Sequence, residues 1–112
     1  MRIAIPVEND TLSTHFGHCQ SFSLSDVDPE TQGIVREERL PAPPHEPGLL
    51  PRWLAERGAT HIIAGGMGQR ALDLFASHGI QVITGAPQET PQLLVQRFLS
   101  GDLATTGNLC DH

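Results

Sequence analysis

The chain has 112 residues, the size of one domain, which leaves no room for a second catalytic domain. Thirteen acidic residues against seven basic ones give a formal net charge of −6, so the phosphates of nucleic acids and anionic membranes are repelled. All seven basic residues are arginine, which excludes Schiff-base chemistry on lysine. The first residues do not follow the pattern of a signal peptide, and no apolar run approaches the length of a membrane-spanning helix, so we expect a cytoplasmic location.

The first part of the chain predicts three strands, over residues 3–7, 21–27 and 34–40, with a loop over 10–18 between the first two. The second strand alternates apolar and polar side chains, which predicts one solvated face. A turn joins the second strand to the third, with Pro29 presetting its own φ and Gly33 able to take a positive φ.

The second part predicts βα units after a proline-rich loop over 41–48. Helices are expected over 49–57, 69–78 and 91–100, and strands over 60–64 and 80–84. Thr90 is the predicted N-cap of the last helix, and Pro91 is its first residue. This order predicts an α/β domain over residues 1–101, with a mixed sheet of about five strands and three helices, followed by a polar tail over 102–112.

Crossover connections through the helices imply parallel pairing with right-handed crossovers, while the opening hairpin adds antiparallel strands. If the first, third, fourth and fifth strands share a direction, the loops at their carboxyl ends open at one edge of the sheet. The loops at that edge are residues 8–19, 41–48, 65–68 and 85–89. Ligands of such sheets bind at this edge.

The first of these loops carries three candidate metal ligands: His15, His18 and Cys19. Imidazole and thiolate donors suit soft or borderline metals, and Gly17 lets the backbone fold tightly around a bound group. The alternative interpretation is a loop with exposed histidines and a buried free cysteine. His45, in the proline-rich loop, is either a preorganised further ligand or a surface histidine.

The tail supplies two more candidate ligands, Cys110 and His112, with Asp111 as a harder oxygen donor between them. A frayed terminus without function is the alternative. An extended tail of this length could reach its own sheet edge or that of a second copy, so a homodimer is one way to complete a coordination sphere.

A glycine-rich turn, Gly65, Gly66, Met67 and Gly68, connects a predicted strand to a helix. Its backbone N–H groups and the helix dipole favour an anionic ligand, and Arg70 adds positive charge. Met67 offers a thioether, or simply packs. The turn matches neither the dinucleotide fingerprint nor a P-loop. His61 and His78 are expected to be structural.

Five segments together resemble the dinitrogenase iron–molybdenum cofactor biosynthesis family: residues 2–7, 13–19, 64–68, 79–85 and 109–112. The resemblance implies an RNase H-like mixed α/β fold with strand order 3-2-1-4-5. It also implies metal or cluster binding, because members include carriers of nitrogenase cofactor or its iron–sulfur precursors and relatives that hold a molybdenum–copper sulfide cluster. His15, Phe16 and Gly17 match the family's cofactor-loop motif, and Cys110 and His112 match a tail found in part of the family.

We therefore expect a non-enzymatic carrier or scaffold for an iron–sulfur or molybdenum-containing cluster, exchanged with donor and acceptor proteins. An enzyme is not expected, because neither an oxyanion site nor an orienting acid accompanies Cys19 and its neighbouring histidines. Two alternatives stay open: a single Zn, Fe or Cu ion on the same donors, and an interaction or regulatory domain that binds a protein and no metal.

Overall fold

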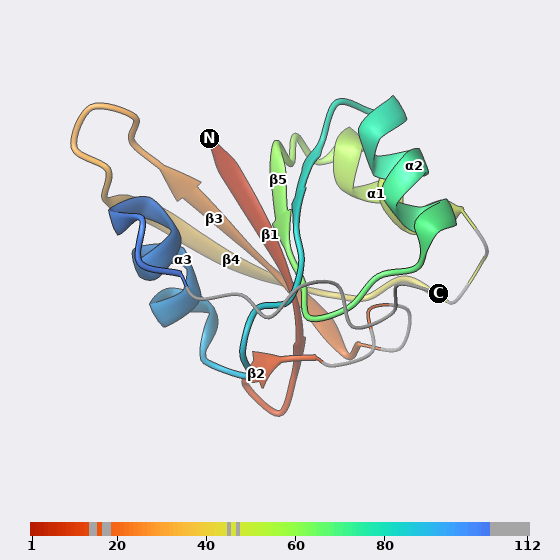
Figure 1. Cartoon of the computed structure of the whole chain (residues 1–112), viewed down its shortest axis with the longest axis horizontal. Helices are drawn as coiled ribbons and strands as arrows, with labels where there is room; N and C mark the ends of the chain where they lie inside the picture. The colour runs from red at the N-terminus through yellow and green to blue at the C-terminus, as the bar shows by residue number, and fades with distance from the viewer. Residues whose placement is uncertain (14–15, 17–18, 45, 47, 104–112) are drawn as a thin grey trace.

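A mixed β-sheet lies at the centre of the structure, a computed structural model that describes residues 1–13, 16, 19–44, 46 and 48–103 (Figure 1). The strands are β1 (Arg2–Glu8), β2 (Thr11–Leu12), β3 (Ser21–Val27), β4 (Ile34–Pro41), β5 (His61–Ile63) and β6 (Gln81–Ile83). The helices are α1 (Leu49–Glu56), α2 (Gln69–Ser77) and α3 (Pro91–Ser100). The α/β class and the three helices are confirmed.

Apart from β2, which pairs with β1, the strands lie in the order β4-β3-β1-β5-β6, which is the order that the resemblance implies. β3 is antiparallel to β1 and to β4, whereas β5 is parallel to both β1 and β6. β1, β4, β5 and β6 therefore point the same way. We call the edge where these four strands end, together with the loops that follow them, the rim.

A sixth strand, β2, corrects the expected five. Asn9 and Asp10 have positive φ angles of 53° and 66°, which make a tight two-residue turn after β1. The chain then pairs back on β1, with Glu8 opposite Thr11. The first part of the predicted loop is therefore a short hairpin.

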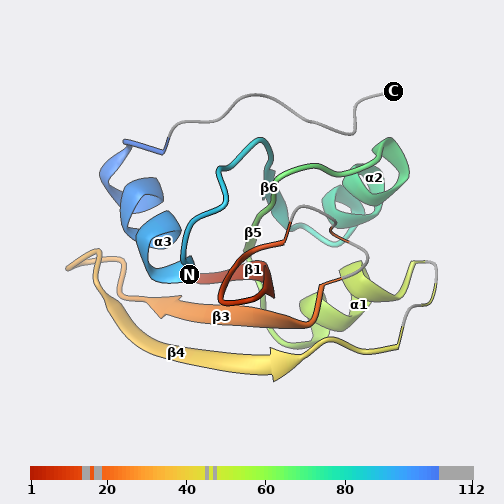
Figure 2. The same cartoon turned by 90° about the horizontal axis from the view of Figure 1, so that it is seen from below.

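Helices cover both faces of the sheet, with α1 and α2 on one side and α3 on the other (Figure 2). β1 contributes to both layers because its side chains alternate. Ala4 packs in the cluster that contains Leu54 of α1 and Phe75 of α2. Ile3 and Ile5 pack in the opposite cluster, against α3.

β3 is buried on both faces, so the prediction of one solvated face is wrong. Phe22 and Leu24 pack toward α1 and α2. Ser23 and Ser25 lie on the other face, opposite isoleucines of β1, and both are 0% exposed. Their hydroxyl oxygens have no hydrogen-bond partner among the described residues. These serines share a face with those isoleucines, which pack with α3, so the helix layer on this side buries a serine face that the sequence pattern assigns to solvent.

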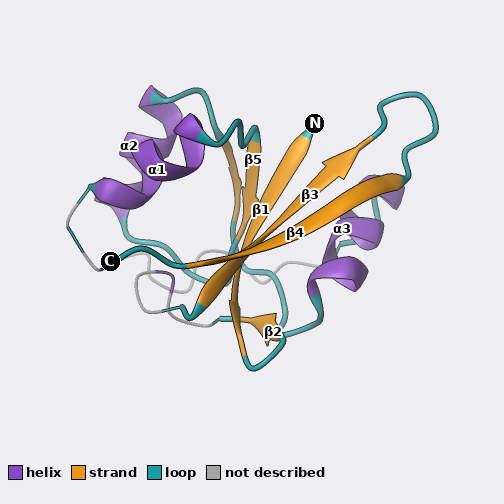
Figure 3. Cartoon of the chain, turned by 180° about the vertical axis from the view of Figure 1, so that it is seen from behind, coloured by secondary structure: helices purple, strands orange, loops and turns teal. Residues whose placement is uncertain are grey.

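β4 is an edge strand of the sheet (Figure 3), and its four central residues, 36–39, are all charged. Arg36 forms an ion pair of 3.1 Å with Glu38, and Arg39 forms one of 3.2 Å with Asp10. Pro41 is the last residue of this strand, so the proline-rich loop begins one residue later than predicted.

The predicted start of α3 is confirmed: the Thr90 hydroxyl accepts a hydrogen bond of 3.4 Å from the backbone N–H of Leu93, and Pro91 opens the helix. In the turn before β4 the positive φ, 55°, falls on Gln32 and not on Gly33. Within the described part of the chain, none of the helices combines the length and the apolar character that crossing a membrane requires.

Candidate functional site

Backbone hydrogen bonds join the loops of the rim to one another. They run from N–H to carbonyl between Gly85 and Gly65 (2.6 Å), Leu12 and Glu89 (3.0 Å), and Ala42 and Gln20 (3.0 Å). Each bond connects loops or strands that are far apart in sequence. The prediction that these loops gather at one edge of the sheet is therefore confirmed.

The ligand loop, which we define as residues 13–19, is fixed to β1 at both of its ends. The backbone N–H of Ser13 donates to the carbonyl of Pro6 (2.9 Å), and that of Gln20, just after the loop, donates to the carbonyl of Val7 (3.0 Å). Ser13 itself is 2% exposed. The loop thus leaves and rejoins the same strand end.

Cys19 is half-buried and packs against the core cluster under α1 and α2. Loss of solvent raises the pKa of its thiol to about 11, because burial penalises the thiolate. Backbone hydrogen bonds oppose this effect only in part. At neutral pH the thiol is therefore protonated, and a metal that binds it must displace a proton.

Phe16 also faces the core. Its ring lies edge-on to Phe75 of α2 at 5.5 Å and to Phe22 of β3 at 6.2 Å, measured between ring centroids. Phe22 in turn contacts Trp53 of α1 at 5.6 Å. Four of the chain's five aromatic side chains thus form one cluster below the rim.

The glycine turn, residues 65–68, lies directly beside the ligand loop. A Cβ atom on Gly65 would stand 3.9 Å from the carbonyl oxygen of Ser13 and 3.7 Å from the Leu12 side chain. Gly65 and Gly66 are buried, whereas Gly68 is exposed with nothing within 4 Å of an added Cβ. The turn therefore approaches the loop closely at one end and opens to solvent at the other.

Met67 lies inside the α1/α2 cluster and is 1% exposed. Of the two roles considered for it, packing agrees with this position.

The start of α2 is open at the rim. Gly68 is its N-cap, no side chain caps the first turn, and no acidic residue lies in that turn. Arg70 is exposed there, and none of the described carboxylates forms an ion pair with it. The positive end of the helix and a guanidinium group thus lie on the solvent side of the glycine turn.

The remaining candidates, His15, Gly17, His18, His45, Cys110 and His112, lie outside the described residues. Among the described residues no group of three or more His, Cys, Asp or Glu side chains could hold a metal ion. The structure therefore brings together Phe16, Cys19, the glycine turn and Arg70 at the rim.

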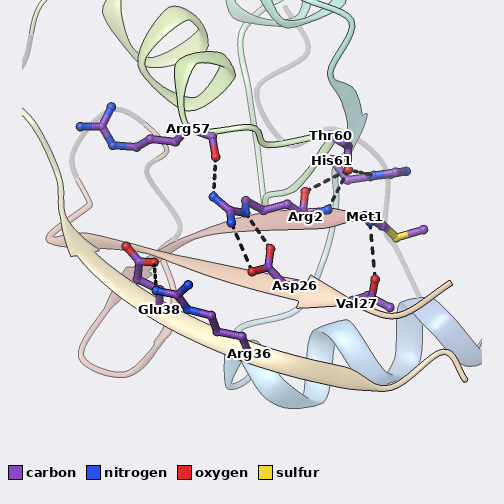
Figure 4. A network of polar contacts seen from close by, with 9 residues as sticks. All are labelled: Met1, Arg2, Asp26, Val27, Arg36, Glu38, Arg57, Thr60 and His61. Carbon is purple, nitrogen blue, oxygen red and sulfur yellow. Dashed lines mark hydrogen bonds and ion pairs between the residues drawn. The ribbon is translucent and has the colours of Figure 1, made fainter.

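His61 and His78 lie away from the rim. His61 is at the amino end of β5, where its Nδ1 lies 2.8 Å from the Thr60 hydroxyl (Figure 4). Its ring lies tilted against that of Phe98 of α3, with 5.7 Å between the ring centroids, and burial lowers its pKa. His78 is the exposed C-cap residue of α2.

Sequence reasoning did not find the partners of the ligand loop, Phe22 and Phe75. The apolar periodicity of β3 and α2 predicts that these two side chains are buried, but it does not predict that they contact the ligand loop. One signal was available in the composition, since a chain with only four Phe and one Trp spends one of these residues within a loop.

A family model described as dinitrogenase iron-molybdenum cofactor matches residues 1–101. The chain belongs to this family. Membership in the dinitrogenase iron-molybdenum cofactor family associates the chain with a metal cofactor and with proteins that handle it.

Similar proteins cover nearly the whole chain. The crystal structure of PH0822 is 33% identical, with 95% of each chain covered and a TM-score of 0.86. The apo form of the orange protein from Desulfovibrio gigas is 26% identical, covers 96% of this chain and 93% of its own, and has a TM-score of 0.73. The uncharacterized protein MJ0580 of Methanocaldococcus jannaschii is 26% identical over 109 residues, which are 92% of this chain and 89% of that protein.

Proposed function

We propose that this family member is a non-enzymatic carrier or scaffold that binds an iron–sulfur or molybdenum-containing cluster as cargo at the rim. One observation carries the proposal: the ligand loop and the glycine turn are direct neighbours, with Gly65 beside the carbonyl of Ser13. A loop rich in soft donors thereby adjoins backbone suited to an anion. Family membership supports the choice of a metal cofactor as cargo.

The proposed ligands are His15, His18 and Cys19, with His45, Cys110 and His112 as auxiliary ligands. Cys19 is the one member of this set whose surroundings the structure describes. Cys19 lies at the base of the rim. The carbonyl of Gln20, the next residue, accepts a hydrogen bond from the backbone N–H of Ala42, so the start of the proline-rich loop lies beside the proposed site. Thiolate and imidazole together suit iron, copper and zinc and do not suit Mg²⁺ or Ca²⁺.

The start of α2, at the end of the glycine turn, would attract a negatively charged cluster. A sulfide-containing cluster is anionic when its ligands include thiolate, and the uncapped start of α2 presents the positive end of a helix. Arg70 adds an exposed cation in the same turn. The chain's net charge of −6 does not oppose binding strongly, since local groups dominate at contact distance.

The raised pKa of Cys19 does not favour a nucleophilic role for its thiol. Catalytic cysteines have a lowered pKa, because the thiolate is the nucleophile. Burial moves the pKa of Cys19 the other way, to about 11. A metal can still take this thiol by displacing its proton, whereas an organic substrate would meet an unreactive group.

Anaerobic reconstitution tests the proposal. The purified chain is incubated with Fe²⁺ and sulfide, with tetrathiomolybdate, and separately with Zn²⁺, and then desalted for metal analysis and a visible spectrum. We expect sulfide-containing absorption and retained metal in the wild type. The double variant His15→Ala/Cys19→Ala should retain about tenfold less metal or none, because two ligands and their chelate are lost.

His78→Ala is the matched control, since it removes an exposed imidazole far from the rim and should leave uptake unchanged. One colourless ion per chain would favour the mononuclear alternative. Absence of uptake under all three conditions would overturn the proposal in favour of a metal-free interaction domain. Unchanged uptake by the double variant would show that the ligand loop is wrongly assigned.

A further inference from the structure

Phe16 occupies an unusual place, because it lies in the middle of the ligand loop and yet its side chain belongs to the core. The ring is edge-on to both Phe75 and Phe22, which are fully buried. It is therefore fastened to two different elements, α2 and β3. Its immediate sequence neighbours are His15 and Gly17.

The contact with Phe75 shows how far the ring reaches. Phe75 follows the N-cap Gly68 by seven residues, which is about 10 Å of helix below the rim. A side chain that begins in a rim loop thus penetrates the layer between the sheet and α2. Edge-to-face aromatic pairs of this kind add to the stabilisation that burial alone supplies.

The ligand loop is consequently held at three points. Its ends are fixed by the backbone hydrogen bonds of Ser13 and Gln20 to β1, and Phe16 fixes its middle. Cys19, the other described residue between the end bonds, also packs against the core cluster.

We propose that Phe16 is a positioning residue: it fixes the ligand loop before metal binds, through Phe22 and Phe75, and it does not contact the metal itself. This inference rests on the proposed function and differs from the role that the family motif suggests for Phe16, which is direct contact with the cofactor. Fixing the loop in advance removes a cost of ordering from the binding step, so it raises affinity without adding a ligand.

Co²⁺ titration of the full chain under anaerobic conditions tests the inference, because thiolate and imidazole ligation give visible absorption bands. Phe16→Ala removes the central contact and keeps every proposed ligand. We expect Co²⁺ affinity to fall by about tenfold, since the ordering of several residues moves into the binding step. Phe16→Leu retains apolar contact without the aromatic edges, and we expect an intermediate loss.

Phe98→Ala is the matched control. Phe98 is also a partly buried phenylalanine, but it packs on the opposite face of the sheet with α3. Thermal unfolding of each variant compares the loss of stability, and Co²⁺ affinity compares the effect on the loop. A selective loss of affinity in the Phe16 variants supports the inference. If Phe16→Ala does not fold, Phe16→Leu against Phe98→Leu gives the same comparison.

Unchanged affinity in the Phe16 variants overturns this inference and leaves the proposed function standing. Equal losses in the Phe16 and Phe98 variants also overturn it, because general destabilisation would then explain both. Absence of Co²⁺ binding by the wild type overturns the inference and the proposed metal site together.

Discussion

The two ends of the sheet are held together by different means. At the amino end, Arg2 donates through Nε to Asp26 at 2.7 Å and through a terminal nitrogen to the carbonyl of Arg57 at 2.6 Å (Figure 4). Thr60 adds a hydroxyl that exchanges hydrogen bonds with the Arg2 backbone at 3.0 Å. The charged side chains of Arg2 and Asp26 therefore link β1 to β3 and to the segment that precedes β5.

At the rim backbone hydrogen bonds make many of the links, beside the Arg39–Asp10 ion pair. The bonds between Gly85 and Gly65 and between Ala42 and Gln20 involve no side chain. Among the rim's side chains, Phe16 is partly buried against the core, and Arg70 is exposed. The comparison indicates that a partly buried arginine network links the strands at the amino end, whereas the glycine-containing loops of the rim are linked largely through their backbone.

Asp26→Asn should lower the stability of the protein by weakening the amino end of the sheet, and it should leave metal uptake at the rim unchanged. The variant removes the charge that receives two hydrogen bonds from Arg2, so we expect a loss of about 1.5 kcal/mol in unfolding free energy, the lower end for charged hydrogen bonds because both side chains are partly exposed. Urea denaturation measures it. Arg36→Ala, which removes an exposed ion pair, is the control and should cost little. A changed metal uptake in Asp26→Asn would contradict the separation of the two ends.

Glycine substitutions sharpen the comparison within the rim. Gly85 has a φ of 78°, so Gly85→Ala should cost about 1 kcal/mol for placing an L side chain in the left-handed region. Gly68 has a φ of −70° and open space around it, so Gly68→Ala adds no left-handed strain and should cost only about 0.5 kcal/mol, for placing alanine at an N-cap. Thermal unfolding separates the two variants. Equal losses would contradict the distinction between a glycine that the backbone requires and one that it does not.

The smallest expected effect is on the pH dependence of stability, and the two ends should respond in opposite directions. The bond from Arg2 lowers the pKa of Asp26, and burial lowers that of His61, so both contributions to stability are present at neutral pH. They are lost as the pH falls, for His61 below its ordinary value of about 6.5 and for Asp26 below about 4.

Cys19, at the rim, has a raised pKa, so its contribution is present below its ordinary value of about 8.5 and is lost as the pH rises toward about 11. Unfolding curves of the metal-free chain across pH measure these trends. Asp26→Asn should flatten the acid limb, and Cys19→Ala should flatten the alkaline limb. A flattening of the opposite limb by either variant would refute the assignment.

Most of the fold was predictable because apolar periodicity and glycine or proline punctuation agree along the chain. Thr90 before Pro91 predicts the start of α3, and the structure confirms it. The hairpin that contains β2 was not predicted, although Asn9 and Asp10 are residue types typical of a turn with positive φ.

Burial was harder to predict than secondary structure. Ser23 and Ser25 alternate with apolar residues, which predicts a solvated face, but they lie on the face of the sheet that packs with α3 and are buried. Strand position in a sheet is a long-range property that local alternation does not encode.

The candidate site was also predictable only in part. Residue types in the ligand loop predict the kind of metal that it suits, and the segment order predicts which loops meet. The role of Phe16 could not be predicted, because Phe75 lies 59 residues further along the chain and its contact exists only in the folded state.

The outer edge of β4 constrains how two copies of this chain can associate. An antiparallel pairing centred between Glu37 and Glu38 sets glutamate against glutamate and Arg36 against Arg39. A pairing centred on either glutamate sets only that residue against its own copy, and it sets the charges on both sides of it against opposite charges. Like charges directly opposite each other destabilise a strand pair, and Pro41 offers no N–H to a partner. The charge pattern of this edge therefore restricts the registers in which two copies could pair through β4, and it disfavours most the register centred between the two glutamates.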